Sequence, residues 1–153
     1  MTTFARRIFF VIALLAVAGT AVSSVSLYHH YGTSKTEFCD FGETFNCDMV
    51  NRSTYSKVMG IPVALIGIAG YLALLALATV YRSKAETPLL LFLASLAGLV
   101  FALRLTYIEA YVLTVWCILC VSSLGLIFLI TLLAATVLVA SRRNPGTNKA
   151  LQS

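Results

Sequence analysis

Four long apolar stretches restrict this 153-residue chain to very few folds. They cover residues 8–28, 60–81, 88–108 and 115–140. A helix rises 1.5 Å per residue, so about 20 apolar residues cross a hydrocarbon core of about 30 Å. Each stretch reaches that length. The sequence therefore predicts an all-α integral membrane protein, in which a bundle of four transmembrane helices forms a single membrane domain over residues 1–153.

The composition agrees with this prediction. The chain is 59% hydrophobic and 11% charged, whereas an average soluble domain is about 45–50% apolar and about 25% charged. A nucleic-acid-binding domain, a disordered tail and a water-soluble enzyme are excluded in spite of the net charge of +5. No nucleic acid is therefore expected among the partners.

The basic residues are distributed unevenly between the two sides of the predicted bundle. The N-terminus, the segment between the second and third stretches and the tail 141–153 hold seven bases against one acid, Glu86. The opposite side, chiefly the loop 31–59, holds three bases and five acids. Lysine and arginine concentrate on the cytoplasmic side of membrane proteins, so both termini are predicted to be cytoplasmic. The seven bases are Arg6, Arg7, Arg82, Lys84, Arg142, Arg143 and Lys149.

The first stretch has a second interpretation. Arg6 and Arg7, an apolar run and the small residues at 21–23 also resemble a cleavable secretory signal. Removal of this stretch would not change the side of the membrane on which the later segments lie.

Four cysteines form two pairs, and both pairs are predicted to lie on the extracytoplasmic face, where disulfides persist. Cys39 and Cys47 lie in the loop 31–59, and Cys117 and Cys120 lie where the fourth stretch begins. Two pairs that are distant in sequence but share one face suggest disulfide or metal chemistry.

The spacing within each pair predicts a different behaviour. Cys117 and Cys120 are three positions apart and share one face of a helix, within reach of one disulfide. The positive end of that helix favours a thiolate at Cys117, and Cys120 lies one turn deeper, towards a lipid-soluble electron acceptor. Cys39 and Cys47 would be about 12 Å apart on a continuous helix, but a disulfide needs Cα atoms within about 7 Å. Residues 40–46 must therefore turn, which Gly42 assists, if this pair is to bridge.

Several functions fit two such pairs. A mobile outer pair could take electrons from a soluble thiol and pass them by thiol–disulfide exchange to the inner pair, which would reduce an acceptor in the membrane. The alternatives are a non-catalytic scaffold held by two disulfides and a zinc site made of four thiolates. The seven-residue gap in the loop pair and the oxidising face disfavour zinc, so no metal is expected.

Charged and aromatic residues near the outer ends of the third and fourth stretches have simple interpretations. Arg104 is expensive in lipid, but it lies near the interface, where it is expected to extend to water or to pair with Glu109. Tyr107, Tyr111 and Trp116 are typical of an interfacial aromatic belt, and any of them could also line a pocket for a lipid-soluble electron acceptor.

A set of further residues accompanies the two cysteine pairs: Cys39-Asp40-x-Gly42, Cys47, Val50, Ser53, Gly60-Ile61-Pro62-x-Ala64-x-x-Gly67 and Cys117-x-x-Cys120. This arrangement resembles the vitamin K epoxide reductase family, and the resemblance covers most of the chain. The bacterial four-helix quinone oxidase that reoxidises the periplasmic thiol oxidase has its C-x-x-C in the first outer loop and its second pair in the second loop. This sequence has the opposite arrangement, which favours the epoxide reductase family.

The resemblance implies a role for each cysteine. Cys117 and Cys120 would form the active-site disulfide, with Cys120 facing the quinone in charge-transfer or covalent contact. Cys39 and Cys47 would form the shuttle pair of a redox-active loop between the first and second helices. Cys47 would make the interloop disulfide with Cys117.

The resemblance also implies a quinone pocket. Ser53 matches a family hydroxyl near the active site, and Tyr111 is a further candidate. The asparagine and tyrosine with which the animal enzymes hydrogen-bond vitamin K fall on Ser56 and Leu124 here. Leucine can donate no hydrogen bond, so vitamin K epoxide reduction is the alternative activity rather than the expected one.

The expected activity is therefore that of the bacterial members: a quinone-dependent thiol–disulfide oxidoreductase of a cell membrane. It would reoxidise a secreted disulfide-forming partner and pass the electrons to a quinone of the ubiquinone or menaquinone type. Many bacterial members carry a fused thioredoxin-like domain, and none is encoded in these residues. The partner is thus expected to be a separate thioredoxin-like (DsbA-like) thiol oxidase.

Overall fold

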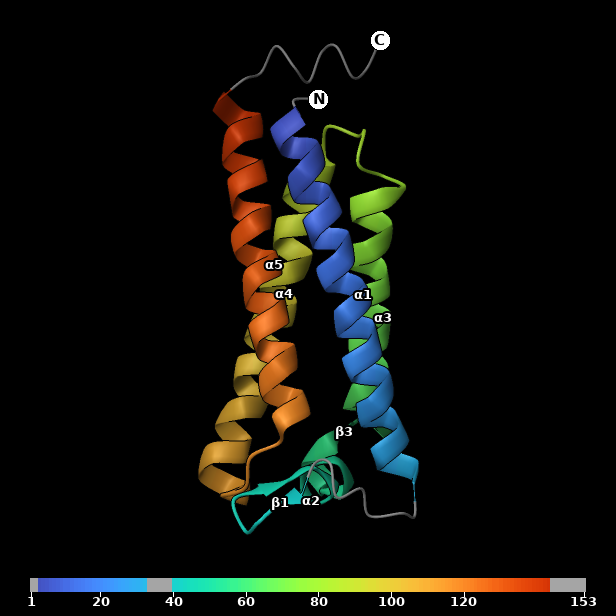
Figure 1. Cartoon of the computed structure of the whole chain (residues 1–153), viewed down its shortest axis with the longest axis vertical. Helices are drawn as coiled ribbons and strands as arrows, with labels where there is room; N and C mark the ends of the chain where they lie inside the picture. Colours follow the sequence, from blue (N-terminus) through green and yellow to red (C-terminus); the bar gives the residue numbers. More distant parts are fainter. Residues whose placement is uncertain (1–2, 33–39, 144–153) are drawn as a thin grey trace.

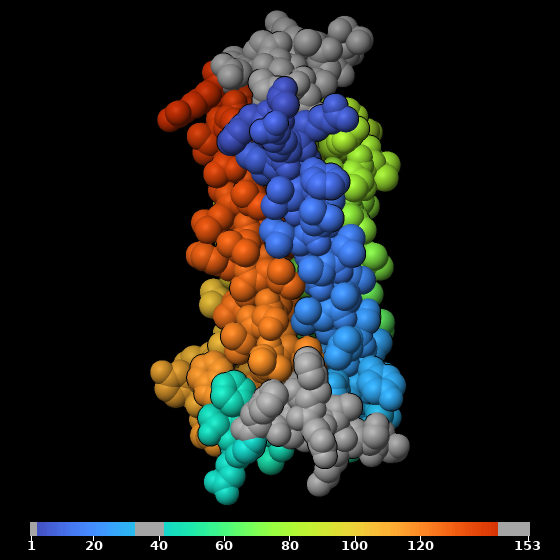
Figure 2. All heavy atoms as spheres, in the orientation of Figure 1, coloured from blue at the N-terminus to red at the C-terminus, as the bar shows by residue number. Residues whose placement is uncertain are grey.

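A computed structural model describes residues 3–32 and 40–143, and these are mostly helical. Four long helices pack side by side: α1 (Thr3–Tyr31), α3 (Val63–Thr79), α4 (Thr87–Ile108) and α5 (Ile118–Arg143). Figure 1 shows them as one elongated bundle, and Figure 2 shows its rod-like outer surface. Much of that surface is apolar; Val100, for example, is 61% exposed. The outside of this bundle therefore suits lipid better than water.

Three of these helices are long and apolar enough to cross a membrane. They are α1, α5 and the continuous segment Thr87–Leu113, which joins α4 to the short helix after it. The helix α3 is equally apolar but has only 17 residues, which corresponds to a length of about 25 Å. The fold is thus that of a helical membrane protein.

The segment between α1 and α3 closes one end of the bundle. It contains the hairpin β1 (Asp40–Phe41) and β2 (Phe45–Asn46), the helix α2 (Cys47–Arg52), the short helix η1 (Thr54–Ser56) and the hairpin β3 (Lys57–Val58) and β4 (Ile61–Pro62). Gly42, with φ of 76°, lies in the turn of the first hairpin. Residues 40–46 therefore turn, as a bridging loop pair requires.

The start of α3 differs from the sequence-based boundary at residue 60. Val58 pairs with Ile61 in an antiparallel hairpin, and the two intervening residues, Met59 and Gly60, have φ of 53° and 85°. Two such residues are typical of the tight turn that matches strand twist, and they cannot continue a helix. Pro62 consequently precedes the first turn of α3 instead of lying within it.

The other boundaries shift by smaller amounts. Helix α1 extends beyond residues 8–28 at both ends, and α5 begins three residues after position 115. The third stretch matches α4 within one residue at each end, but it continues into a single π-helical turn, η2 (Glu109–Leu113). Thr114, with φ of 51°, ends this turn.

The bundle core is centred on Tyr71 of α3. Its hydroxyl donates to the carbonyl of Ser123 on α5 at 2.9 Å and is also 2.9 Å from the Ser123 hydroxyl. Its ring lies against Gly19 of α1, where an added Cβ would overlap it. Three helices therefore meet at one side chain. The remaining core residues are Ile8, Phe9, Ile12, Ala16, Leu74, Ala78, Leu91, Ile127, Ile130, Ala134 and Val137.

The two ends of the bundle differ in chemistry. The start of α1, the end of α5 and the loop between α3 and α4 lie at one end, opposite α2 and the hairpins (Figure 1). Six of the seven bases assigned to one side lie in these three segments, and Lys149 falls outside the described residues. The cysteines that the structure describes lie at or near the other end, in or beside α2 and at the start of α5.

Candidate functional site

Cys117 occupies the position directly before the first turn of α5. Its carbonyl accepts a hydrogen bond from the Val121 N–H at 3.0 Å, which makes it the N-cap residue of the helix. A thiol at this position faces the positive end of the helix dipole. The expected placement of the C-x-x-C at a helix start is therefore present, with Cys120 in the first turn.

A backbone bridge brings the outer loop to this helix start. The Trp116 N–H donates to the Thr44 carbonyl at 2.9 Å, and the Asn46 N–H donates to the Trp116 carbonyl at 3.1 Å. The residues that follow the bridge on its two strands are Cys47 and Cys117. Both are fully buried, at 0% exposure, and they belong to one apolar cluster at this end of the bundle.

Helix α2 is held in place by contacts with α1. The Asn46 side chain accepts from the Met49 N–H at 2.9 Å and caps α2. The Ser26 hydroxyl donates to the Asn51 side-chain oxygen at 2.7 Å, and His29 lies 3.3 Å from Asp48. These interactions fix the segment that begins with Cys47.

The cysteines differ in redox state. Cys47 is disulfide-bonded, whereas Cys117 and Cys120 are free thiols. Cys47 is therefore not bonded to Cys117, and the interloop disulfide is not formed in this state. Cys39, the other expected member of the shuttle pair, lies outside the described residues.

The two thiols of the C-x-x-C interact directly. A hydrogen bond from the Cys120 side chain lowers the pKa of Cys117 below its usual range, although burial and the nearby Glu109 charge act in the opposite direction. The thiolate is the nucleophile in thiol–disulfide exchange. Cys117 is consequently the member of the pair suited to leave as a thiolate when a mixed disulfide with the loop is resolved.

Glu109 is a site residue that the sequence reasoning missed. It is 2% exposed, and its Oε2 accepts from the Cys117 N–H at 3.2 Å. Of the two expectations for Arg104, pairing with Glu109 is wrong, because Arg104 is exposed and the one ion pair within residues 3–32 and 40–143 joins His29 to Asp48. The spacing of Glu109 in the sequence could have indicated its position. Phe101, Leu105 and Glu109 recur every four residues, so they share one helix face, and all three line the same cavity.

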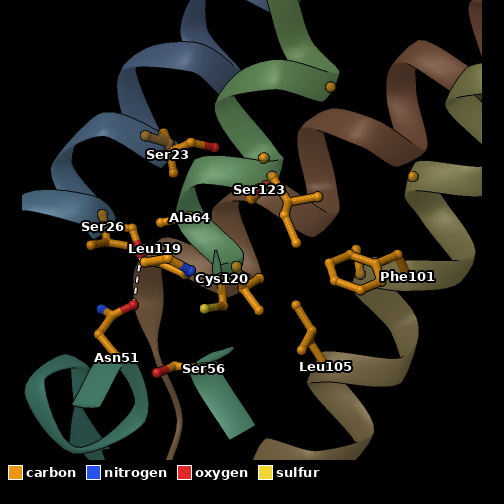
Figure 3. Close-up of a pocket in the computed structure, with 18 of the residues that line it drawn as sticks. Ser23, Ser26, Asn51, Ser56, Ala64, Phe101, Leu105, Leu119, Cys120 and Ser123 are labelled. Carbon is orange, nitrogen blue, oxygen red and sulfur yellow. Dashed lines mark hydrogen bonds between the residues drawn. The ribbon is translucent and has the colours of Figure 1, made fainter. Parts of the chain in front are cut away.

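That cavity lies between the four helices, directly beneath α2, with a volume of about 360 Å³. Cys120, Ser56 and Asn51 lie in its wall, and Phe101 and Leu105 approach from α4 (Figure 3). The lining is mainly apolar, and small residues such as Ala97 and Gly98 leave room beside α4. A mostly apolar cavity with a few polar groups is typical of a small-molecule site, and a flat ring fits this description.

The structure separates the expected pocket residues into two groups. Ser53 and Ser56 line the cavity, but each hydroxyl donates to a nearby backbone carbonyl. Tyr111 and Leu124 do not line it; Tyr111 is 73% exposed and its ring packs against Tyr107. The π turn carries Tyr111 towards the surface, while Glu109 at its start faces inward. Asn51 lines the cavity without having been expected to.

No group of three or more His, Cys, Asp or Glu side chains suited to a metal ion occurs in the described part of the chain, which excludes Cys39.

The sequence model of the vitamin K epoxide reductase family matches residues 10–136. The match covers most of the chain and runs from α1 into α5, so it includes the outer loop, the cavity and the C-x-x-C.

Proposed function

The chain belongs to the vitamin K epoxide reductase family, and from this membership and the site geometry we propose that it is a quinone-dependent thiol–disulfide oxidoreductase. It would reoxidise a secreted thioredoxin-like partner and pass the electrons to a membrane quinone of the ubiquinone or menaquinone type. Membership itself supports a membrane oxidoreductase of the disulfide and quinone kind.

The observation that carries the proposal is the position of Cys117 between two different partners. On one side it shares a buried cluster with Cys47 of the outer loop. On the other it is hydrogen-bonded to Cys120, which lines the cavity. Electrons can pass from the loop to the cavity through exchange at Cys117, because each step needs only neighbouring sulfurs.

The loop pair would exchange with the soluble partner. Reduction of the Cys39–Cys47 disulfide by that partner would free a thiol at Cys47, which then attacks the Cys117–Cys120 disulfide at Cys117. Resolution by Cys39 would restore the loop disulfide and leave two thiols at 117 and 120. Oxidation of these thiols by the quinone would complete the cycle.

The proposal includes a topology. All four long helices, α3 among them, would cross the membrane, with both termini in the cytoplasm and the cysteines on the extracytoplasmic face. The clustering of Arg6, Arg7, Arg142 and Arg143 at the bundle end opposite the cysteine-containing loop supports this orientation. The hairpins at the start of α3 compensate for its short length by continuing the chain to that face.

Turnover by purified protein tests the proposed function. With a reduced thioredoxin-like substrate and a ubiquinone or menaquinone analogue, the protein is expected to consume quinone, and Cys120→Ala should abolish consumption. Trapping in a Cys120→Ser variant should enrich a Cys47–Cys117 cross-link. An intact rate in Cys120→Ala would refute the mechanism, and a protein with no turnover and a stable Cys39–Cys47 bond would be the disulfide-stapled scaffold.

A matched pair of substitutions tests the cavity as the quinone site. Ala97→Phe places a ring in the cavity, whereas Val100→Phe places one on the outer surface of the same helix. The first should raise KM for quinone and the second should not. Equal effects would argue against this cavity. A parallel assay with vitamin K epoxide distinguishes the two activities known for the family.

A further inference from the structure

The carboxyl group of Glu109 lies beside both thiols of the proposed redox pair. Its Oε2 accepts from the Cys117 N–H at 3.2 Å, and Glu109 and Cys120 line the same cavity. Its second oxygen, Oε1, is buried and has no hydrogen-bond partner within the described residues. A buried carboxyl with an unused acceptor is costly, so a purely structural role does not explain it.

Other titratable groups around the cavity are occupied or distant from the thiols. The Tyr71 hydroxyl is bound to Ser123 on α5. The Nδ1 of His30 contacts the backbone carbonyl of Asn51. Among the described residues that line the cavity, Glu109 is the one acid, and Cys120 lines the same cavity.

We propose that Glu109 is a catalytic residue that accepts the proton of the Cys120 thiol and releases it to the quinone site as the thiol pair is oxidised. This role rests on the proposed function. Formation of the Cys117–Cys120 sulfur–sulfur bond releases two electrons and two protons, and conversion of a quinone to a quinol takes up two of each. One of the two protons passes from Cys120 through the Glu109 carboxylate to the quinone, and the other is the proton that the Cys117 thiol loses as it ionises, which the quinone also takes up.

The geometry suits this transfer. Glu109 is fixed by the Cys117 N–H, so its carboxyl stays beside the pair whichever protonation state it adopts. It lies at the junction of α4 and the π turn, and π turns often occur at functional sites. The cavity is mainly apolar and is lined by α2 and all four long helices, so an acid–base side chain supplied by the chain can carry a proton where few other polar groups are present.

Glu109→Gln separates proton transfer from positioning. Glutamine keeps an oxygen that accepts from the Cys117 N–H but cannot act as a base near neutral pH. General acid–base groups contribute about 10²- to 10⁴-fold to rates, so quinone reduction should fall at least about 100-fold. Glu109→Asp retains a carboxylate and should keep more of the rate. Glu86→Gln, at an exposed position on the other end of the bundle, is the matched control and should leave the rate unchanged.

A second readout does not use quinone. In reduced protein, Glu109→Gln removes a negative charge beside Cys117, so alkylation of Cys117 by iodoacetamide should become faster at a given pH. Slower quinone reduction together with faster alkylation supports the proposal. A wild-type rate of quinone reduction, unchanged alkylation, or a loss of both reactions would overturn it. The wild-type rate itself tests the proposed function, and the ratio of variant to wild-type rates tests Glu109, so the two failures are distinguishable.

Discussion

Removal of the N-cap of α2 tests quantitatively whether a folded α2 is needed to hold Cys47 near Cys117. Asn46 accepts from the Met49 N–H at 2.9 Å, and its own N–H donates to the Trp116 carbonyl. Asn46→Ala removes the side-chain cap but leaves the backbone bridge intact. Loss of a cap costs about 1 kcal/mol, and α2 has only six residues, so it has little other local stability.

The expected effect appears in the equilibrium between Cys47 and Cys117. With Cys39→Ser and Cys120→Ser, these two cysteines alone remain, and titration against glutathione measures their effective concentration. If α2 must be folded for Cys47 to meet Cys117, a loss of about 1 kcal/mol lowers that concentration about fivefold. Asn46→Asp retains a capping oxygen and is expected to behave as the parent does.

Two results would refute this reasoning. An unchanged effective concentration in Asn46→Ala would show that the β bridge at Trp116 alone presents Cys47. An equal loss in Asn46→Ala and Asn46→Asp would show that the capping hydrogen bond is not the cause. In the first case the position of Cys47 would not depend on the order of α2, and in the second it would not depend on the cap of α2.

Two further predictions concern the core and the thiol pair. Gly19→Ala places a methyl group against the Tyr71 ring and should lower the free energy of unfolding by about 1–3 kcal/mol, as measured by denaturing-detergent titration. Gly125→Ala is the control and should leave the free energy of unfolding unchanged, because nothing lies within 4 Å of the added Cβ. Equal losses in the two variants would contradict this prediction. Cys120→Ala removes the hydrogen bond that lowers the pKa of Cys117, so the midpoint for alkylation of Cys117 should move to higher pH, and an unchanged or lower midpoint would be inconsistent.

The long helices could be predicted from the sequence because an apolar run of about 20 residues is typical of a membrane-spanning helix. The ends of the helices could not, since they depend on local turn chemistry. Gly60-Ile61-Pro62 suggests a helix start, yet the positive φ of Met59 and Gly60 makes a hairpin of the same residues. The strand pairing of Trp116 with the loop was likewise invisible, because a two-residue bridge leaves no periodic signal.

The site was only partly predictable for a related reason. The cysteine spacing is a strong local pattern, and it led to Cys117 and Cys120 directly. Glu109 is eight residues earlier, and its contact with Cys117 requires the chain to reverse through Thr114. From the sequence, Glu109 was placed at the membrane interface because it lies near the end of an apolar stretch. In the structure its side chain is buried. Glu109 follows Phe101 and Leu105 at intervals of four residues, so it lies on the same helix face as they do. The sequence does not show that this face lines a cavity.

The position of Cys117 also explains why one cysteine of the pair meets the loop and the other meets the cavity. Cys117 precedes α5, where its sulfur shares a cluster with Cys47, and Cys120 lies one turn further along the helix, in the cavity wall. A thiolate at Cys117 is stabilised by the Cys120 thiol but opposed by a Glu109 charge. Under the proposed roles, a proton held by Glu109 therefore favours the Cys117 thiolate. Electron transfer to the cavity and proton transfer through Glu109 would then depend on each other, and Glu109→Gln should uncouple them.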